Sequence, residues 1–549
     1  MGWYLNIGTI LLVQYAAADF FILETPLGKI QGSVLKSRLG RDIFSFRGVR
    51  YAEAPIHDLR FKPPVPVKQW NGIYNATKDG PLCPQPTEDP ISEDCLILNV
   101  YSSKLPTSTN NPKRPVILFI HPGGLYSVGS TSVWLGPNYF MDQDIVLVTM
   151  NYRLGTLGFL STGSEEAPGN NGFKDQVEAL RWIQKNILSF GGDPDSVTIM
   201  GYSAGGWSVI LHMVSPMSRG LFHKAVAMSG SPLIMPIPDN MLDLAKKQAR
   251  LLNCPDDIIP NMITCLKNVP YETLGNSLSG FREYGKNPII IWSPVIEKDF
   301  GQPRFLPDHP DRLIENGRFQ KVPLITGQTE FEFGYKAFEI IGNETLEKEM
   351  NDDFEKVAPI AFGYERNSDR SKQISRVLRK FYFDDKKIDE SQLNYLSELY
   401  SDSIIGFSNN RAAKLFTRYG DKPVYYYRLS YRGRFSHFYL PDSNNSIPYG
   451  VVHHDDLIYL FYIQKLFPLF GKDSPTEVEM VEKLTKLYAN FAKTGNPTPE
   501  SSGSYGDVEW KKFSLEEQQY LEIGNEVKMK KRLYKNRFDE WEKLFPIQK

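Results

Sequence analysis

Continuous apolar runs bounded by turn-forming residues mark the first half of the chain. Three of them are rich in β-branched residues and span 115–121, 144–152 and 196–202, which is typical of parallel strands covered on both faces. Helix-periodic segments follow at 170–192 and 204–215. Because such strands alternate with helices, the pattern predicts an α/β fold with a central, mostly parallel twisted sheet flanked by helices.

The chain is long enough for several small domains, but nothing in it marks a boundary between them. It has 549 residues, of which 41% are hydrophobic and 23% are charged, as in globular proteins. It contains no internal repeat, no low-complexity segment and no obvious linker, and the most loop-like stretch, 106–115, is short. We therefore expect a single domain over 19–549 that carries large insertions.

The N-terminus has the pattern of a secretory signal peptide. Residues 7–13 are apolar and the three alanines at 16–18 form a small-residue cleavage site, so we expect residues 1–18 to be removed. The start of the segment has no Lys or Arg, which leaves a short buried or membrane-anchoring segment as the alternative. No later stretch approaches the length of a spanning helix. We therefore expect a secreted protein without a stable membrane anchor.

The chain has four cysteines, Cys83, Cys95, Cys254 and Cys265, which form two close pairs in the sequence. Three disulfide connectivities are open to them. Pairing within each close pair is favoured, because short loops close at the least entropic cost. A zinc site is the alternative, but neither pair has Cys-x-x-Cys spacing or a nearby His, so no metal is expected.

Charge and glycosylation motifs describe the expected surface. The net charge of −1 gives no general attraction to nucleic acid or to an anionic membrane. One basic run, 528–537, is expected on a solvated helix face. Sequons for N-glycosylation begin at Asn75, Asn343 and Asn444, which suits a secreted chain.

A serine at the end of the third apolar run is the candidate nucleophile. Ser203 lies at the centre of a Gly-x-Ser-x-Gly pattern, between a predicted strand and a predicted helix. Gly201 and Gly205 allow the tight turn and close backbone packing that expose such a serine, and the helix N-terminus favours developing negative charge. The alternative is an ordinary serine among small turn residues, which the strand-turn-helix context disfavours.

Backbone amides for an oxyanion hole are expected in the segment 121–126, which follows the first apolar run. Gly123 and Gly124 can turn their N–H groups toward a substrate oxygen there. The N–H group of Ala204, directly after the serine, would complete the hole. A plain Pro-Gly turn is the alternative interpretation of this segment.

The general base must be a histidine downstream of Ser203, with an acid between the two in the chain. Of eight histidines, the adjacent pair His453 and His454 stands out, because Asp455 and Asp456 follow it beside an apolar run. A metal cluster is one alternative, but adjacent residues rarely converge on one ion. A structural histidine pair is another. Many carboxylates lie between the serine and the histidines, and composition does not choose among them.

Nine segments of the chain match one known family in the correct order. They are 46–55, 59–64, 93–101, 121–130, 151–160, 170–176, 190–206, 450–456 and 490–499. Through them the chain resembles the type-B carboxylesterase and cholinesterase family of the α/β-hydrolase fold over nearly its whole mature length. Within that family it is most similar to the secreted esterases of insects.

The resemblance supplies the acid that the residues alone leave open. The family has a Gly followed five residues later by a Glu and then commonly by another Gly. Gly327 and Glu332 fit this pattern, and Phe333 stands where the second Gly is usual. The resemblance therefore implies Glu332 as the acid, with Glu330 as a nearby competitor, and His453 as the base.

The chain departs from the family pattern at two further positions. His454 occupies a position that is commonly small. Pro122 replaces the first Gly of a three-Gly run, whereas the expected donors Gly123 and Gly124 are kept. The resemblance also implies the disulfides Cys83–Cys95 and Cys254–Cys265.

These patterns predict a secreted serine carboxylesterase that hydrolyses small carboxylic esters. Ser203, His453 and Glu332 would form its triad and pass through an acyl-enzyme, without any cofactor. Choline esters are disfavoured, because the first disulfide loop, 84–94, has no aromatic residue for a cation–π contact.

Three alternatives remain open at this point. One is an enzyme like the juvenile hormone esterases, although these typically carry Gln before the nucleophile, where Tyr202 stands. Another is a non-catalytic adhesion or binding relative, a class that commonly loses a triad residue and adds a membrane anchor. The third is a neutral lipase. The natural ester and the oligomeric state cannot be read from the sequence.

Overall fold

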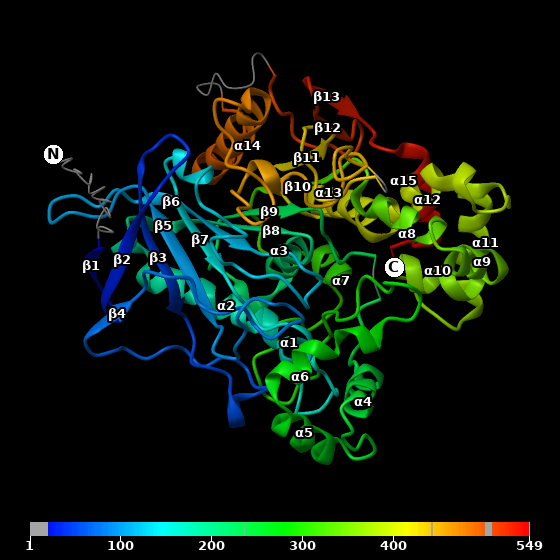
Figure 1. Ribbon diagram of the computed structural model, residues 1–549, viewed down its shortest axis with the longest axis horizontal. Coiled ribbons are helices and arrows are strands. Elements are labelled where there is room, and N and C mark those ends of the chain that lie inside the picture. The colour runs from blue at the N-terminus through cyan, green and yellow to red at the C-terminus, as the bar shows by residue number, and fades with distance from the viewer. Residues whose placement is uncertain (1–19, 235, 441–442, 500–507, 548–549) are drawn as a thin grey trace, which may run out of the picture.

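A large sheet forms the centre of the molecule (Figure 1). The computed structural model describes residues 20–234, 236–440, 443–499 and 508–547. The strands of the sheet are Phe20–Thr25 (β1), Gly28–Lys36 (β2), Asp42–Arg50 (β3), Ile73–Asn75 (β4), Ile97–Ser102 (β5), Arg114–Ile120 (β6), Val146–Met150 (β7), Gly192–Tyr202 (β8), Lys224–Met228 (β9), Leu324–Thr329 (β10), Val424–Leu429 (β11), Gln519–Ile523 (β12) and Val527–Lys531 (β13).

The pairing of these strands is parallel in the middle of the sheet and antiparallel at its ends. Their spatial order is β1-β2-β3-β5-β7-β6-β8-β9-β10-β11-β12-β13, with β4 beside β2. Every pairing from β7 through β12 along this order is parallel. Along this order, the pairings from β1 to β7 and that of β12 with β13 are antiparallel. The short strand β4 pairs with β2 in parallel. The predicted α/β fold with a mostly parallel sheet is confirmed.

Helices cover both faces of the sheet (Figure 1). Helices α2 and α3 pack on one face and α14 packs on the other. The helices are Gly155–Phe159 (α1), Asn171–Asn186 (α2), Ala204–Val214 (α3), Leu242–Leu251 (α4), Ile259–Asn268 (α5), Tyr271–Asn276 (α6), Pro310–Glu315 (α7), Lys336–Ile341 (α8), Glu344–Asp352 (α9), Phe354–Phe362 (α10), Asp369–Phe383 (α11), Leu393–Ser401 (α12), Phe407–Tyr419 (α13), Pro475–Thr494 (α14) and Lys535–Leu544 (α15).

The central strand β6 shows why its sequence is continuously apolar. Val116, Leu118 and Ile120 are buried in the hydrophobic cluster that contains α2 and α3. Ile117 and Phe119, which alternate with them, are buried in the cluster that contains α14. Because successive side chains of a strand point to opposite faces, a strand covered on both sides needs apolar residues at every position.

Long insertions separate the last strands of the parallel region. Helices α4 to α7 lie in the chain between β9 and β10, and α8 to α13 lie between β10 and β11. The first group extends below the sheet in the view of Figure 1, and most of the second group lies beyond its right-hand end. Each insertion begins at the carboxyl end of a parallel strand, the edge of the sheet at which ligands bind in folds of this kind.

One expectation about the C-terminal region is wrong. The basic run 528–537 does not lie on a helix face, because its first residues belong to strand β13 and α15 begins only at Lys535. Its lysines alternate with Val527 and Met529, which pack partly buried against the core. Such an alternation with a period of two is typical of a strand at the edge of a sheet.

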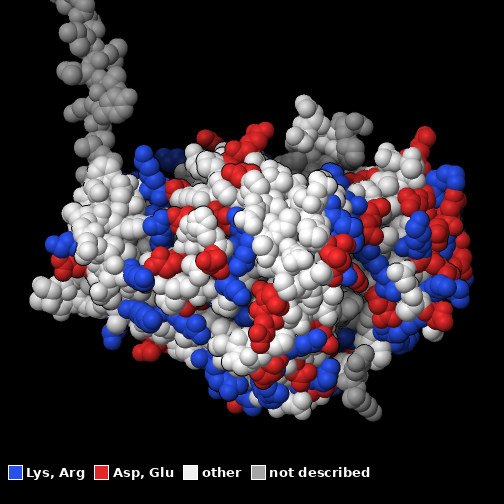
Figure 2. All heavy atoms as spheres, turned by 90° about the horizontal axis from the view of Figure 1, so that it is seen from below, with Lys and Arg blue, Asp and Glu red and all other residues white. Residues whose placement is uncertain are grey.

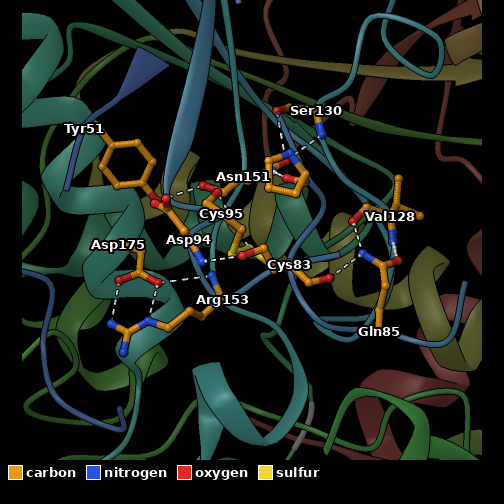
Figure 3. Close-up of a disulfide and its surroundings, with 12 residues drawn as sticks. Tyr51, Cys83, Gln85, Asp94, Cys95, Val128, Ser130, Asn151, Arg153 and Asp175 are labelled. Atoms are coloured by element: carbon orange, nitrogen blue, oxygen red, sulfur yellow. Dashed lines mark hydrogen bonds and ion pairs between the residues drawn. A yellow bond between two sulfur atoms is a disulfide. The ribbon is translucent and has the colours of Figure 1, made fainter. Parts of the chain in front are cut away.

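Both local disulfides, Cys83–Cys95 and Cys254–Cys265, are present in the structure. Gln85, just after the first cysteine, fixes a segment that is distant in sequence (Figure 3). Its Nε2 donates to the carbonyl oxygen of Val128 at 2.8 Å, and the Val128 N–H donates to Gln85 Oε1 at 2.6 Å. The first disulfide loop therefore holds the turn that follows Gly123 and Gly124.

The remaining expectations concern the surface charge, the glycosylation sites, the signal peptide and a membrane anchor. Figure 2 shows basic and acidic side chains interspersed over the face it presents, without a large field of one sign. The three sequon residues Asn75, Asn343 and Asn444 are exposed. The predicted signal peptide, 1–18, lies outside the described residues. Among the helices that the structure describes, none is both long and apolar enough to cross a membrane.

Candidate active site

A sharp turn between β8 and α3 presents Ser203. The strand ends at Tyr202 and the helix begins at Ala204, so the serine alone makes the turn, with a φ of 56° and a ψ of −117°. This left-handed backbone is costly for a residue with a side chain. Gly205 makes the turn possible, because a Cβ atom there would lie 2.0 Å from the carbonyl oxygen of Ile120.

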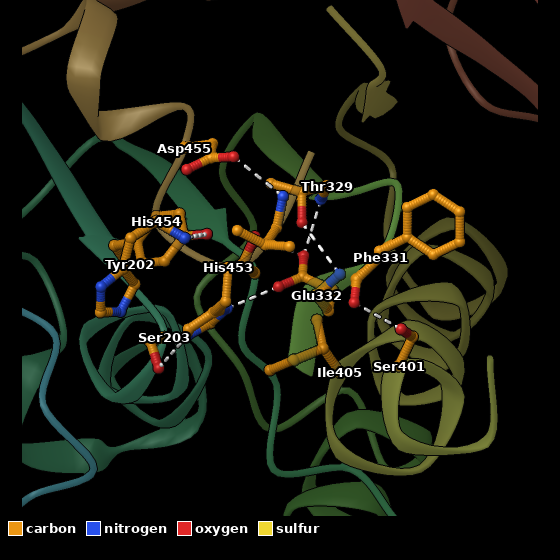
Figure 4. A network of polar contacts seen from close by, with 12 residues as sticks. Tyr202, Ser203, Thr329, Phe331, Glu332, Ser401, Ile405, His453, His454 and Asp455 are labelled. Carbon is orange, nitrogen blue, oxygen red and sulfur yellow. Dashed lines mark hydrogen bonds and ion pairs between the residues drawn. The ribbon is translucent and has the colours of Figure 1, made fainter. Parts of the chain in front are cut away.

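Ser203, His453 and Glu332 lie in hydrogen-bond contact (Figure 4). The distance between Ser203 Oγ and His453 Nε2 is 2.8 Å, and that between His453 Nδ1 and Glu332 Oε2 is 2.5 Å. The backbone N–H of His453 also donates to the backbone carbonyl oxygen of Glu332 at 2.9 Å. Glu332 and His453 are almost fully buried, whereas Ser203 is partly exposed. A carboxylate at Nδ1 fixes the tautomer in which Nε2 can accept the serine proton.

Two further residues, which the sequence did not single out, hold the carboxylate. Ser229 Oγ donates to Glu332 Oε1 at 2.7 Å, and the Thr329 N–H donates to the same oxygen at 2.7 Å. Ser229 directly follows β9, and Thr329 ends β10. The carboxyl ends of parallel strands meet at one edge of a sheet, so the position after a buried strand was the signal that could have found them.

Glu330, the competitor for the acid position, lies elsewhere. Its carboxylate is 3.8 Å from the guanidinium groups of both Arg428 and Arg432. The structure brings Glu332 together with His453, and within the described chain it shows no contact between Glu330 and that histidine.

Burial governs the protonation of the histidine and the carboxylate. It raises the pKa of Glu332 to about 8, although hydrogen bonds from Ser229 and Thr329 oppose the shift. Burial also lowers the pKa of His453 well below its usual value, and His437 nearby adds to that shift. At neutral pH the imidazole of His453 is therefore uncharged, which is the form that can accept a proton.

The three expected oxyanion donors lie around the same pocket as Ser203. Gly123, Gly124 and Ala204 all line it. Among the described residues, none accepts a hydrogen bond from the N–H groups of these three. Gly123 has a φ of 112°, and a Cβ atom there would lie 2.0 Å from the Ser127 carbonyl oxygen. The loop therefore needs glycine at this position to adopt this conformation.

The rest of the pocket is built mainly from apolar and aromatic side chains. No Asp, Glu, Lys or Arg occurs among the described residues that line it. Within the part of the chain that the structure describes, no three His, Cys, Asp or Glu side chains group so that they could hold a metal ion. The apolar and aromatic lining residues are Tyr126, Val128, Trp207, Ile289, Ile290, Phe333, Tyr335, Ile404, Ile405 and Phe438.

Both departures from the family pattern next to the triad contact the histidine. The Phe333 ring is 4.2 Å from the His453 ring between centroids and is tilted by 32°. The His454 ring is 4.5 Å from it and is tilted by 37°. His453 therefore packs against one aromatic ring from the acid loop and one from its own loop.

Comparison with known proteins agrees with this geometry. The profile of the carboxylesterase family matches residues 19–541. Juvenile hormone esterase of Tribolium castaneum is 35% identical over 512 residues, which cover 89% of this chain and 86% of that protein. Esterase FE4 of Myzus persicae is 36% identical over 495 residues, which cover 87% of this chain and 85% of that protein.

A solved structure is similar over almost the whole chain. It is the crystal structure of juvenile hormone esterase from Manduca sexta with OTFP covalently attached. The likeness has a TM-score of 0.82 at 26% identity and covers 96% of this chain and 100% of that one.

The parallel sheet, with a serine turn and polar side chains at the carboxyl ends of its strands, places the protein among the α/β-hydrolases. Within them it belongs to the carboxylesterase family and is a carboxylic ester hydrolase. The family resemblance seen in the sequence is confirmed, and so is the similarity to insect esterases.

Proposed function

We propose that this chain is a secreted serine carboxylesterase whose triad consists of Ser203, His453 and Glu332. The observation that carries the proposal is the continuous chain of hydrogen bonds from Ser203 Oγ through both ring nitrogens of His453 to Glu332. A hydroxyl, a neutral imidazole and a buried carboxylate in this order form the arrangement that activates a serine for attack on a carbonyl.

The proposed reaction has two halves. Ser203 Oγ attacks the ester carbonyl carbon while His453 Nε2 takes its proton, and the N–H groups of Gly123, Gly124 and Ala204 stabilise the oxyanion. His453 then donates that proton to the leaving alkoxy oxygen, which departs as the alcohol and leaves the serine acylated. A water molecule, deprotonated by the same nitrogen, attacks the acyl-enzyme, and the carboxylic acid leaves as the serine recovers its proton.

The pocket favours uncharged esters as substrates. Its apolar lining has no carboxylate that would attract a cationic substrate and no Lys or Arg that would bind an anionic one. The covalent attachment of OTFP in the Manduca sexta juvenile hormone esterase supports covalent chemistry for this family. Activity on juvenile hormone is an alternative. It is disfavoured because Tyr202 stands directly before the nucleophile, where the juvenile hormone esterases typically carry Gln.

We also propose that the protein is secreted as one domain over 19–549, after removal of residues 1–18. Its two disulfides support an oxidising compartment. The exposure of Asn75, Asn343 and Asn444 leaves all three sequons accessible to glycosylation.

Labelling with an organophosphate tests the proposal directly. The purified protein should hydrolyse an uncharged aromatic acetate, and the reagent should stop turnover with one adduct that mass spectrometry maps to Ser203. The Ser203→Ala variant, as matched control, should take up no adduct. Turnover that continues with Ser203 modified would contradict the proposal. Folded protein with neither turnover nor adduct would favour a non-catalytic binding relative, with Phe333 and His454 as the first residues to revert.

The pH dependence follows from the two buried groups. Burial favours the uncharged forms of Glu332 and His453, so this pair takes up a proton as the pH falls below about 8. A proton on Glu332 removes the acceptor for Nδ1, and one on His453 removes the base, so the protonated pair is inactive. We expect kcat/KM for an ester without ionisable groups to rise from about pH 6 to about pH 9. Maximal activity on the acid side, with the fold intact by circular dichroism, would contradict this assignment.

A further inference from the structure

His454 stands in the pocket at a position whose backbone favours glycine. Its φ is 85°, in the left-handed region that residues with a side chain rarely adopt. Its N–H group donates to Tyr202 Oη at 2.7 Å, which fixes the turn. The ring lines the pocket together with Ser203 and His453. Backbone outliers of this kind cluster at functional sites.

The ring of His454 is surrounded by other rings. It packs edge to face against Tyr202, with centroids 5.2 Å apart, and against His437 at 5.4 Å. It makes no hydrogen bond with any other residue that the structure describes. His454 is partly exposed in the pocket, and neither of its ring nitrogens is among the buried described atoms that lack a partner, so both nitrogens are open to water or to a ligand.

The protonation state of this ring decides what it can bind. Burial and the neighbouring imidazoles of His453 and His437 lower the pKa of His454 well below its usual value. The ring of His454 is therefore an uncharged imidazole at neutral pH and does not change its charge near that pH. Such a ring offers one N–H donor and one nitrogen acceptor, and it can bond an oxygen atom of an uncharged ligand.

The proposed reaction tells which part of an ester lies near this ring. His453 Nε2 must reach the leaving alkoxy oxygen to protonate it, so the alcohol portion lies beside His453. The His454 ring is 4.5 Å from the His453 ring. Figure 4 shows His454 with Tyr202 on the side of His453 that faces away from Glu332. His454 therefore borders the alcohol portion of the ester and not the carboxylate of the triad.

We propose that His454 is a specificity-determining residue whose imidazole hydrogen-bonds an oxygen atom in the alcohol portion of the substrate. The enzyme then selects uncharged esters whose alcohol carries an ether or hydroxyl oxygen within a few bonds of the ester oxygen. This inference rests on the function proposed for Ser203, and it adds the chemical class of the alcohol.

A pair of nearly isosteric esters tests the proposal. Methoxyethyl butanoate and butyl butanoate differ by one oxygen in place of one methylene group in the alcohol. The measured quantity is the ratio of their kcat/KM values. In the variants His454→Phe and His454→Gly this ratio should fall about three- to tenfold below that of the wild type, the size of one net hydrogen bond. His454→Gly suits the left-handed backbone, and His454→Phe keeps the ring, so a folded variant is available in either case.

Two controls separate this ring from its surroundings. His437→Phe changes a ring that contacts His454 but is not among the described residues lining the pocket, and it should keep the wild-type ratio. The acyl-side pair, butyl methoxyacetate and butyl butanoate, should show an unchanged ratio in the His454 variants. Thermal melting of each variant verifies that it is folded.

Each outcome has a definite meaning. A fall in the alcohol-side ratio confined to the His454 variants supports the proposal. An unchanged alcohol-side ratio overturns it, as does a fall in the acyl-side ratio or an equal fall in His437→Phe. Failure of the underlying function looks different, because wild-type protein would then hydrolyse neither ester and Ser203→Ala would change nothing.

Discussion

Replacing Ser203 by alanine is expected to lower kcat for ester hydrolysis by about four orders of magnitude or more, with the fold intact. The substitution removes only Oγ, the atom 2.8 Å from His453 Nε2. The backbone bonds that hold the turn are untouched, because the Ser203 N–H still donates to Met228 and its carbonyl oxygen still accepts from Trp207. Steady-state rates on an uncharged acetate and a melting curve measure the two effects.

A serine in helix α3, which follows Ser203, provides the matched control for that variant. Ser208 is buried, and its hydroxyl donates to the Ala204 carbonyl oxygen at 2.9 Å. It is not among the described residues that line the pocket. Its hydroxyl also accepts from Gln176 Nε2 at 3.0 Å. Ser208→Ala therefore loses two buried hydrogen bonds without losing the proposed nucleophile, and its kcat should stay within a few fold of the wild type. If Ser203→Ala also kept most of its activity, Ser203 would not be the nucleophile.

The parts of the fold that the sequence predicts well are those that depend on local chemistry. The three apolar runs became β6, β7 and β8 because a strand buried on both faces requires such a run. The serine turn was predictable because Gly205 leaves no room for a Cβ atom against Ile120. Each of these features is marked by a few consecutive residues, although the contact that requires glycine at position 205 is with the distant residue Ile120.

The basic run near the C-terminus shows a limit of this kind of argument. Its charge suggested a solvated helix, but Val527 and Met529 gain burial by alternating with lysines in β13. Long-range pairing with β12 decided the structure there, against the local pattern. The walls of the pocket were hidden for a similar reason, because Ile289 and Ile404 come from separate insertions that only the fold brings together.

The choice of the acid was also beyond local reasoning. Glu330 and Glu332 are two residues apart, have the same chemistry and both follow β10. What distinguishes them is the path of the loop, which turns Glu332 toward His453 and leaves Glu330 near Arg428 and Arg432. Family resemblance pointed to Glu332, whereas composition and spacing alone left many carboxylates open.

Replacing Glu332 by glutamine is expected to lower kcat about 10³- to 10⁴-fold, as the loss of the orienting carboxylate does in other triads. Glutamine has nearly the same shape, and its amide oxygen can still accept from Ser229 Oγ and the Thr329 N–H. With that oxygen so held, the amide NH2 faces His453 Nδ1 and donates to it, which moves the imidazole proton to Nε2. Nε2 then has no free lone pair to accept the serine proton, so His453 cannot act as the base.

Glu330→Gln is the matched control, because it makes the same chemical change two residues away. It removes only the charge facing Arg428 and Arg432 at 3.8 Å, where the side chain is partly exposed, so kcat and melting temperature should change little. The Glu332 variant should also lose the rise in kcat/KM with pH, since the carboxyl group that couples to His453 is gone. A large loss in Glu330→Gln with normal kcat in Glu332→Gln would move the acid to Glu330. Equal losses in both variants, with lowered melting temperatures, would instead mean that the loop acts through its structure and not through one carboxylate.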